Sequence, residues 1–482
     1  MGRTHRRAAC AALVTLGLLT AGCSNSKSGD AAATTAPAAV TAPPTTAASS
    51  TSAAADTTAP DGGGTTTAAA VADQRDTFEP ISGVPGVTDT EISFASIATE
   101  ANNPLGTNIK NAYNEGIKAY FAYRNDEGGI YGRKLKLGAE IDDELGSNQQ
   151  RALEVISSDK YFGAFVATLL FTGAADLNDA GVPTYIWNIH ATEFANRPNL
   201  FGQVGAGCAD CTSQLTSYLA NKAGAKKVAS LGYGTSENSK VCSETQKASF
   251  ELYGKDLGFE FAYLNDNVAF GMPNGIGPEV TAMKDAGVDF VATCLDLNGM
   301  KTLAQELDRQ GMQNVVLYHP NTYNQQFVAE AGGVFDGDYV GASFAAFEYD
   351  AGIAAEQKFF EYMKKQGSEL SELAMTGWLN AALAFDGLVA AGPKFDRASV
   401  VAATNKLTAW NADGLVDPID WTRQHNAPTD ADRSNYYKQV CSSVVQVEAG
   451  KFVPVGPVDK PFLCWPGDSK AWSDPVPTNF AP

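Results

Sequence analysis

The chain has 482 residues, of which 44% are hydrophobic and 18% charged, and its formal net charge is −19. This length is ample for two domains of ordinary size. The sequence contains no basic stripe, and with its acidic balance this argues against nucleic acid as a partner.

The first 22 residues read as a signal peptide. Three arginines precede an apolar run, residues 8–19, which is too short to span a membrane comfortably. The run ends in Leu19-Thr20-Ala21-Gly22-Cys23, which is similar to a bacterial lipobox, where the thiol of Cys23 would be acylated and become the mature N-terminus. Acyl chains contribute ~0.8 kcal/mol per buried methylene, so several of them anchor a protein to the cell membrane. The alternative is secretion after ordinary cleavage.

Residues 23–80 consist mainly of Ala, Thr, Pro, Ser and Gly, with hardly a large apolar side chain. Such a segment cannot bury enough surface to offset its chain entropy. We therefore expect a lipidated Cys23 followed by a disordered tether that separates the folded body from the membrane.

Residues 108–141 are predicted to form a helix, a turn and a strand. From Asn108 to Tyr123, apolar residues recur at helical spacing with polar residues between them, which predicts a helix with one buried face. Gly128 and Gly129 end it, because glycine adopts a left-handed exit without a Cβ penalty. Lys134–Ile141 then alternates as a strand.

Strands and helices alternate on both sides of this segment. The strands expected in the first series are Glu91–Ile97, Lys134–Ile141, Tyr161–Thr168 and Val182–Ile186. Those of the second series are Lys226–Leu231, Phe259–Leu264, Phe290–Thr293 and Val315–Tyr318. Helices are expected between them over Asn238–Leu252, Pro278–Ala286 and Met300–Gln310. Two such series predict an α/β chain of two doubly wound, Rossmann-like lobes.

One segment carries a specific pattern of residues. It contains Glu115-Gly116-Ile117, then Asn125-(x)2-Gly128-Gly129-Ile130-(x)-Gly132-Arg133-Lys134-Leu135, then Asp142-Asp143 and Ala152. In this pattern the chain resembles the type I solute-binding proteins of ABC importers, the family that includes the leucine/isoleucine/valine-binding receptors. The resemblance continues more loosely from about Thr88 to Trp421.

The resemblance implies the type I periplasmic binding protein fold, in which a three-stranded hinge joins the two lobes. It assigns residues 86–204 plus 319–428 to the N-terminal lobe and residues 205–318 plus 435–482 to the C-terminal lobe. The chain would cross between lobes near Gly202–Gly205, near Leu317–Pro320 and within Thr422–Ser434. The helix Ala374–Ala391 would return to the first lobe, with its apolar side chains in the core.

Ligands of open α/β sheets bind beyond the carboxyl ends of the strands, so two facing lobes would line one cleft with these loops. The candidate ligand-binding residues lie in such loops: Thr99, Leu170, Phe171, Thr172, Trp187, His190, Ala191, Thr192, Tyr233, Asp296, His319 and Tyr323. No cofactor is expected.

The loop before Thr172 points to the chemistry of the solute. In amino-acid-binding relatives, hydroxyl groups here and the N–H groups of the next helix hold the ligand carboxylate. In this chain only Thr172 keeps a hydroxyl, and the three residues before it are apolar. A buried anion would be poorly compensated there, so a solute with a sizeable hydrophobic part is expected. Phe171 and Trp187 would stack on it or pack within the lobe.

Each polar candidate has two interpretations. Asp296 lies in the loop that meets the ligand amine in amino-acid-binding relatives, where its carboxylate would hold a cation, or it caps the helix that follows. Tyr233 faces the ligand or packs. His190 and His319 would hydrogen-bond the ligand or pack at the hinge, and no short histidine spacing favours a metal site. Asp142 and Asp143 are expected in a turn, because adjacent strand residues point to opposite faces.

Six cysteines remain after Cys10 in the signal and Cys23 are set aside, an even number in an oxidising compartment. We expect Cys441 to pair with Cys464, because residues 437–455 read as a hairpin with a returning tail. Cys208, Cys211, Cys242 and Cys294 would pair among themselves. A zinc site is the alternative for these four, but the Cys208-(x)2-Cys211 spacing lacks a second paired half.

The sequence therefore predicts an extracytoplasmic, lipid-anchored receptor rather than an enzyme. It would capture a small, partly apolar solute (amino-acid-like, an amide or an aromatic acid) and deliver it, as a monomer, to the permease subunits of an ABC transporter. The alternative is the same fold used as a ligand-sensing ectodomain or adhesion module without transport.

Overall fold

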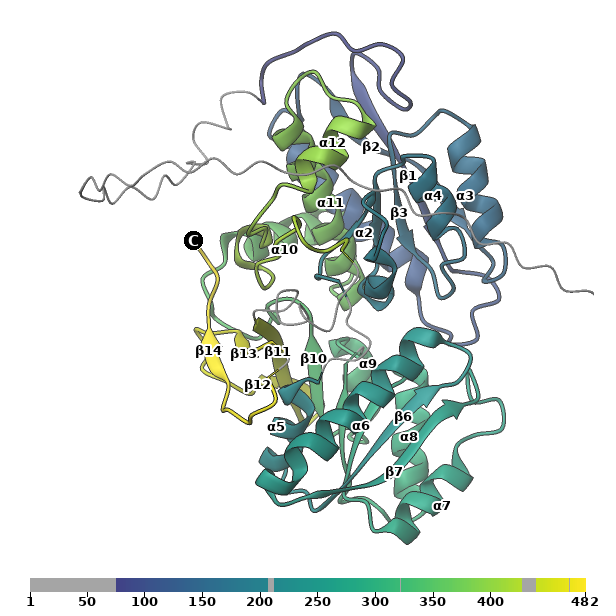
Figure 1. The fold of residues 1–482 in the computed structure, drawn as a ribbon, viewed down its shortest axis with the longest axis vertical. Helices are drawn as coiled ribbons and strands as arrows, with labels where there is room; N and C mark the ends of the chain where they lie inside the picture. Colours follow the sequence, from purple (N-terminus) through teal and green to yellow (C-terminus); the bar gives the residue numbers. More distant parts are fainter. Residues whose placement is uncertain (1–74, 207–211, 321, 427–438, 468) are drawn as a thin grey trace, which may run out of the picture. The chain divides into compact units, whose positions relative to one another are not determined.

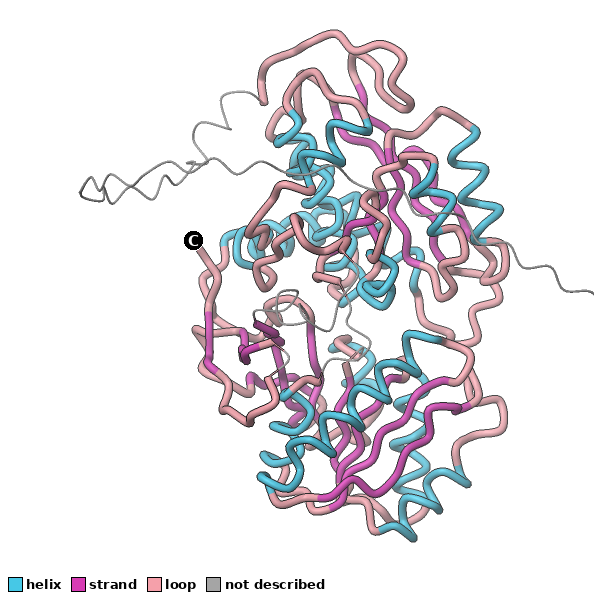
Figure 2. The backbone as a smooth tube through the Cα atoms, in the orientation of Figure 1, coloured by secondary structure: helices cyan, strands magenta, loops and turns pink. Residues whose placement is uncertain are grey.

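The structure is a computed structural model that describes residues 75–206, 212–320, 322–426, 439–467 and 469–482. The described residues belong to one compact unit. Figure 2 shows their strands gathered in two separate sheets, with helices beside each sheet. This is the α/β fold of two parallel-sheet lobes that the sequence predicts.

The first sheet is parallel and has the strand order β2-β1-β3-β4-β5. Its strands are β1 (Glu91–Ala98), β2 (Lys134–Asp142), β3 (Gly163–Ala167), β4 (Thr184–Ile186) and β5 (Leu200–Gly202). The helical segments of this part are α2 (Ile109–Asp126), α3 (Asn148–Ser157), α4 (Ala174–Asp179) and the 3-10 segment η1 (Asn188–Phe194). Further along the chain, α10 (Ala354–Gln366), α11 (Glu372–Ala391), α12 (Arg397–Thr404) and η2 (Ala412–Gly414) join them. In Figure 1, α3 and α4 lie on one side of this sheet and α2 and α11 on the other.

The second sheet has the order β14-β13-β11-β10-β9-β8-β6-β7, with β12 paired to β11. Its parallel strands are β6 (Lys227–Tyr233), β7 (Glu260–Val268), β8 (Phe290–Cys294), β9 (Val316–His319) and β10 (Tyr339–Ala342). The antiparallel edge consists of β11 (Gln439–Glu448), β12 (Lys451–Pro454), β13 (Phe462–Pro466) and β14 (Val476–Thr478). Its helices are α5 (Gln214–Lys222), α6 (Glu237–Leu257), α7 (Gly277–Ala286), α8 (Leu297–Arg309) and α9 (Gln325–Glu330).

Strand alternation divides the core of the second lobe into two layers. On β6, Val228 faces the cluster that contains Phe250 of α6, while Ala229 belongs with Val280 of α7 and Met300 of α8. Successive strand residues point to opposite faces, so both faces of the strand are buried. This explains why the parallel strands are almost continuously apolar rather than alternating with polar residues.

The two sheets repeat one topology. In the first, β1 lies between β2 and β3 and is followed outward by β4 and β5; in the second, β6 lies between β7 and β8 and is followed by β9 and β10. β10 is therefore the counterpart of β5, and the chain leaves each lobe only after its fifth parallel strand. The crossing predicted near Leu317–Pro320 is wrong, because the chain stays in the second sheet through Ala342 and returns to the first lobe before α10. The assignment of residues 319–342 to the N-terminal lobe is wrong for the same reason.

The start of the folded body also differs from the sequence prediction. Tyr131 donates its backbone N–H to the carbonyl of Arg75, and the Arg133 guanidinium donates to the carbonyl of Glu79 at 2.8 Å while lying 4.8 Å from the ring centre of Phe78. Residues 75–80 are thus held on the first lobe, although the tether was expected to reach residue 80. Arg133, from the motif that carried the family resemblance, is fully buried and makes this attachment.

The helix α11 is the most apolar element of the first lobe. It is long and apolar enough to cross a membrane by length and composition, but most of it is buried inside the protein. Two glycines allow it to pack directly on α2: a Cβ on Gly377 would lie 2.0 Å from the carbonyl oxygen of Tyr113, and one on Gly116 would lie 1.8 Å from that of Ala374. This close contact fixes the position of the first turn of α11, which carries Glu372.

Hydrogen bonds hold the crossings between the lobes in place. The side chain of Gln424 accepts a hydrogen bond from the backbone of Ala206 at 2.7 Å. The backbone N–H of Ala345, on the corrected crossing, donates to Leu415 at 2.9 Å. Most of the segment in which the third crossing is expected, Thr422–Ser434, lies outside the described residues.

Candidate functional site

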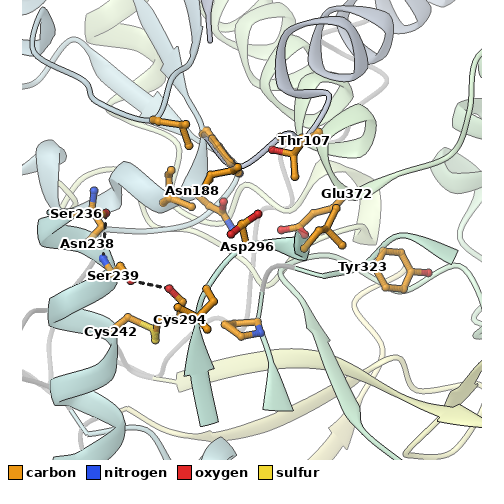
Figure 3. A pocket seen from close by; sticks show the side chains of 18 of the residues that line it. Thr107, Asn188, Ser236, Asn238, Ser239, Cys242, Cys294, Asp296, Tyr323 and Glu372 are labelled. Carbon is orange, nitrogen blue, oxygen red and sulfur yellow. Dashed lines mark hydrogen bonds between the residues drawn. A yellow bond between two sulfur atoms is a disulfide. The ribbon is translucent and has the colours of Figure 1, made fainter. Parts of the chain in front are cut away.

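A cavity of about 790 Å³ lies between the two lobes. Small-molecule pockets measure roughly 300–1,000 Å³, so the cavity suits a small solute. Its walls come from segments that follow strands of both sheets: the loop after β1, η1 after β4, the start of α6 after β6, and the loops after β8 and β9. The first turn of α11 adds a further wall (Figure 3). These are the carboxyl ends of the parallel strands, where ligands of such sheets bind.

Of the twelve residues predicted from sequence, half line this cavity. These are Trp187, Ala191, Thr192, Tyr233, Asp296 and Tyr323. The other six do not line it: Thr99, Leu170, Phe171, Thr172, His190 and His319. Most of these six side chains are kept out of the cavity by hydrogen bonds and packing within their own lobe.

The Thr99 hydroxyl and the Nε2 atom of His190 are engaged by groups of the first lobe, and His190 Nδ1 faces Asn238 of the second lobe at 3.1 Å. The Thr99 hydroxyl lies 3.2 Å from that of Thr168 and accepts from the N–H of Leu169 at 3.0 Å. His190 Nε2 lies 2.6 Å from the carbonyl oxygen of Thr168, and burial lowers the pKa of His190 to about 4. The ring is therefore neutral at physiological pH and serves the architecture of the loop.

The loop after β3 turns away from the cavity. The Thr172 hydroxyl, the group expected at a ligand carboxylate, accepts a hydrogen bond from the N–H of Gln149 at the start of α3, at 3.2 Å. The Phe171 ring packs on His190 with their centres 5.6 Å apart, and Leu170 is partly exposed. Only Leu169 of this loop lines the cavity.

His319 lies beneath the cavity wall, on β9. It is completely buried, its Nε2 is 2.8 Å from Asp338 Oδ2, and it packs on Phe335. Tyr323 does reach the cavity, and its hydroxyl is occupied by Glu348, to which it donates at 2.6 Å.

Asp296 combines both roles that the sequence allowed. As the N-cap of α8 it accepts from the N–H groups of Asn298 at 3.0 Å and Gly299 at 3.3 Å, and it also lines the cavity. The Tyr233 hydroxyl donates to it at 2.5 Å. Burial raises the pKa of the Asp296 carboxyl, and the three hydrogen bonds that it accepts act in the opposite direction by lowering that pKa.

Several cavity residues escaped the sequence analysis. Asn188 and Asn238 are polar side chains in the walls, Tyr318 is an aromatic one, and Glu372 is an acid on the first turn of α11. Candidate residues were expected only in loops that follow strands, whereas Glu372 lies at the start of a helix. Asn188 directly follows the candidate Trp187, and Asn238 begins the helix predicted over Asn238–Leu252, so their polar side chains were the available signal.

Glu372 has an unusual environment. Its side chain is 7% exposed, and its Oε1 has no hydrogen-bond partner among the described residues. Burial raises the pKa of its carboxyl to about 8. The helix N-terminus favours an acid at this position, and Ser371 caps the helix by accepting from Ala374 at 3.2 Å.

Hydrogen bonds join the lobes beside the cavity. The Thr192 hydroxyl of the first lobe donates to Asn238 Oδ1 at 3.0 Å, and Asn238 Nδ2 lies 3.1 Å from His190 Nδ1. On another side, the amide of Asn298 donates to the carbonyl oxygen of Leu105. The structure thus shows the lobes in contact around the cavity.

Two disulfides are present among the described residues. Cys441 and Cys464 link β11 to β13, as the sequence predicts. Cys242 and Cys294 link α6 to the end of β8 and line the cavity. Ser239 reinforces this link by donating to the carbonyl oxygen of Cys294 at 2.6 Å (Figure 3). Cys208 and Cys211 lie outside the described residues. Within the described part of the chain, no three His, Cys, Asp or Glu side chains gather as metal ligands would.

Comparison with solved structures shows the same fold in transport proteins. The chain is similar to a fatty acid ABC transporter substrate-binding protein from Thermomonospora curvata (17% identity, 82% of this chain and 97% of that chain, TM-score 0.61). It is also similar to a branched-chain amino acid ABC transporter protein from Thermus thermophilus with bound valine (17% identity, 76% and 96% covered, TM-score 0.58). A solute-binding protein of an ABC transporter from R. palustris in complex with benzoate gives the same values (17%, 76% and 96%, TM-score 0.58).

A search of curated protein sequences finds no match. The family model described as "Periplasmic binding protein" matches residues 104–451, which is most of the chain and includes the residues that line the cavity. On this match, the chain belongs to the periplasmic binding protein family.

Proposed function

We propose that the chain is the solute receptor of an ABC importer and binds a small, partly apolar solute in the cavity between its lobes. The observation that carries the proposal is this cavity of about 790 Å³, walled by strand ends of both lobes. The solved relatives bind or transport fatty acids, valine and benzoate, which are all small and partly apolar. Proteins of this family bind rather than transform their solutes, so no enzymatic turnover is expected.

The contacts between the lobes support a mechanism of closure. A solute shifts an equilibrium only through interactions that differ between the two states. The bonds of Asn238 to Thr192 and of Asn298 to Leu105 need the lobes to be together, and so does a solute that touches both walls. Solute and inter-lobe bonds therefore stabilise the same closed state, which the permease subunits recognise.

The solute contacts that we propose come from both lobes. In the first lobe, Trp187 and Ala191 offer apolar contact, and in the second, Tyr233 and Asp296 offer a ring and a carboxylate. Trp187 is well suited to an anchoring role, because its indole Nε1 is buried and has no hydrogen-bond partner among the described residues.

The membrane anchor is part of the same proposal. The lipobox-like segment that ends at Cys23 and the tether after it precede the described residues, and together they would hold an extracytoplasmic monomer near its permease. A Cys23→Ser variant is expected to move from the membrane fraction to the soluble fraction. A protein that stays in the membrane fraction after this substitution has another anchor.

The binding proposal is tested with protein that starts after Cys23. It is titrated with amino acids, amides, aromatic acids and short fatty acids, and its thermal unfolding is followed. A solute at ~100-fold its Kd should add about 2.7 kcal/mol of stability. Trp187→Ala should abolish that shift, whereas Trp472→Ala, outside the cavity, should keep it. A panel that stabilises neither the wild type nor the control would contradict the proposal.

The import step is tested in vesicles that carry the candidate permease. Uptake of the identified solute should depend on addition of the protein. Binding without permease-dependent uptake would instead support a receptor that senses its solute.

A further inference from the structure

The cavity wall contains acidic side chains and, among the described residues, no basic ones. Four acids line it: Glu115, Asp296, Glu369 and Glu372. None of the described residues that line it is Lys, Arg or His. A carboxylate solute would therefore meet no basic side chain among them, whereas a positively charged nitrogen would meet several carboxyl groups.

The environment of Glu372 independently indicates that a hydrogen-bond donor to its carboxyl is missing among the described residues. Its carboxyl is more than nine-tenths buried, lines the cavity and has an Oε1 without a partner among the described residues. A buried polar atom normally finds a hydrogen bond, because leaving it unpaired costs about 1–3 kcal/mol. In the folded receptor, a donor that arrives with the solute would supply that bond.

Two further acceptors lie on the same part of the cavity. Figure 3 shows the side chains of Asn188, Asp296 and Glu372 gathered there. The Asn188 Nδ2 is 3.5 Å from the Ser343 hydroxyl, while its Oδ1 has no partner among the described residues. Two carboxyls and an amide oxygen form a set of acceptors, which suits a group that only donates hydrogen bonds, such as an ammonium.

Aromatic and aliphatic side chains surround this acceptor set. The cavity wall also contains Trp187, Tyr233, Phe270, Tyr318 and Tyr323, with Leu105 and Leu297. Aromatic faces attract cations and also hold apolar groups. The walls therefore fit a solute with one positively charged nitrogen and a hydrophobic body.

We propose that the cavity takes an organic amine in its protonated form, with the ammonium held between Glu372 and Asp296 and the hydrophobic body against the aromatic wall. This inference rests on the proposed function and names the class of its solute. The arrangement differs from a zwitterion site, because the expected carboxylate-binding hydroxyl of Thr172 is engaged by Gln149.

Binding of the ammonium is expected to release a proton from Glu372. Burial holds the pKa of Glu372 at about 8, so the carboxyl is protonated in the empty receptor at neutral pH. An ammonium beside it favours the ionised form, and the carboxyl then releases its proton to solvent as the solute binds. The titratable groups that face Glu372 or share the cavity wall with it are Tyr318, Tyr323 with its partner Glu348, Asp296 with its partner Tyr233, Glu115 and Glu369.

The test uses sets of three compounds that share one hydrophobic body and differ in charge. One set is 2-phenylethylammonium, 3-phenylpropanamide and 3-phenylpropionate, and a second is hexylammonium, heptanamide and heptanoate. Affinities are measured by calorimetry at pH 7. The ammonium of at least one set is expected to bind about 30-fold or more tighter than its carboxylate.

Affinity measurements on two variants, and at several pH values, then test whether Glu372 and Asp296 cause the preference for the ammonium. Glu372→Gln should lower ammonium affinity about 30-fold, and Asp296→Asn about 10-fold, while both keep the folded state by circular dichroism. In the wild type, ammonium affinity should rise up to about tenfold per pH unit below pH 8, and Glu372→Gln should remove this dependence. Glu330→Gln, an exposed acid on α9 outside the cavity wall, should change neither property.

The outcomes separate this inference from the proposed function. Binding of carboxylates or amides in preference to ammoniums overturns the assignment to amines but leaves a solute receptor. An unchanged ammonium affinity in Glu372→Gln overturns it as well. If no compound of these sets and no solute of the broader panel binds, both proposals fail.

Discussion

The loop after β3 and the loop after β8 occupy equivalent positions, since each follows the third strand of its lobe and lies next to the first strand. The loop after β3 is tied into its own lobe, where Thr168 donates to Asp143 and Thr172 accepts from Gln149. The loop after β8 presents Asp296 to the cavity. Topology brings both loops to the cleft, and their hydrogen bonds decide which one offers groups to a solute.

The largest effect that we expect concerns the covalent support of the loop after β8. The disulfide Cys242–Cys294 closes a sequence separation of 52 residues, and its loss should cost about 4 kcal/mol of stability in the loop-entropy description. The double variant Cys242→Ser/Cys294→Ser tests this by urea unfolding. The matched control is Cys441→Ser/Cys464→Ser, with a separation of 23 residues and an expected cost of about 3 kcal/mol. A smaller loss for the first pair than for the second would show that the loop is held by its other contacts.

The second prediction contrasts the two loops directly. Phe171→Ala should lower stability by about 3 kcal/mol, because the ring is buried against His190, but it should leave solute affinity unchanged. The sequence left two roles open for Phe171, stacking on the solute or packing within the lobe, and its contact with His190 favours packing. Leu170→Ala, at a partly exposed neighbour, should change neither property. Weakened binding by folded Phe171→Ala would return this loop to the site.

The third prediction concerns the helix that brings Glu372 to the first-lobe wall. Gly377→Ala places a Cβ 2.0 Å from the carbonyl oxygen of Tyr113, so α11 has to move away from α2 at a cost of about 2 kcal/mol. Gly146→Ala is the matched control, because a Cβ there meets no atom within 4 Å. Thermal unfolding measures both. Equal stability of the two variants would show that the helices separate without cost.

The sequence predicted helices and strands well where the spacing of apolar residues within one segment is enough to identify the element. The helix over residues 108–123 and the strand over residues 134–141 differ from α2 and β2 by three residues or fewer at each end. β10 was missed because four residues, Tyr339–Ala342, carry too little pattern to be recognised. Its existence follows from pairing with β9 and β11, which only the assembled sheet shows.

The site was harder to predict than the fold, for a physical reason. Position in a strand-end loop was enough to find Trp187, Tyr233 and Asp296. It could not show that the Thr172 hydroxyl accepts a hydrogen bond from Gln149, because that bond joins a loop to the start of a helix 23 residues earlier in the chain. Glu372 lies on α11, and this helix returns to the first lobe only after β10. Its position in the cavity wall therefore follows from tertiary packing.

The smallest effect that we predict concerns the bond between the lobes themselves. Asn238 of the second lobe accepts from Thr192 and reaches His190 of the first, so Asn238→Ala should destabilise the closed state by about 1 kcal/mol and weaken solute binding several-fold. The bond between Asn238 and Thr192 should favour the closed state even without solute. X-ray scattering of the empty Asn238→Ala variant should therefore show a larger radius of gyration than that of the empty wild type, because more molecules are open. Asn405→Ala removes a bond to Pro198 within the first lobe and should leave that radius unchanged. If Asn238→Ala weakens binding while the radius stays the same, Asn238 acts through the solute and the two walls close without its help.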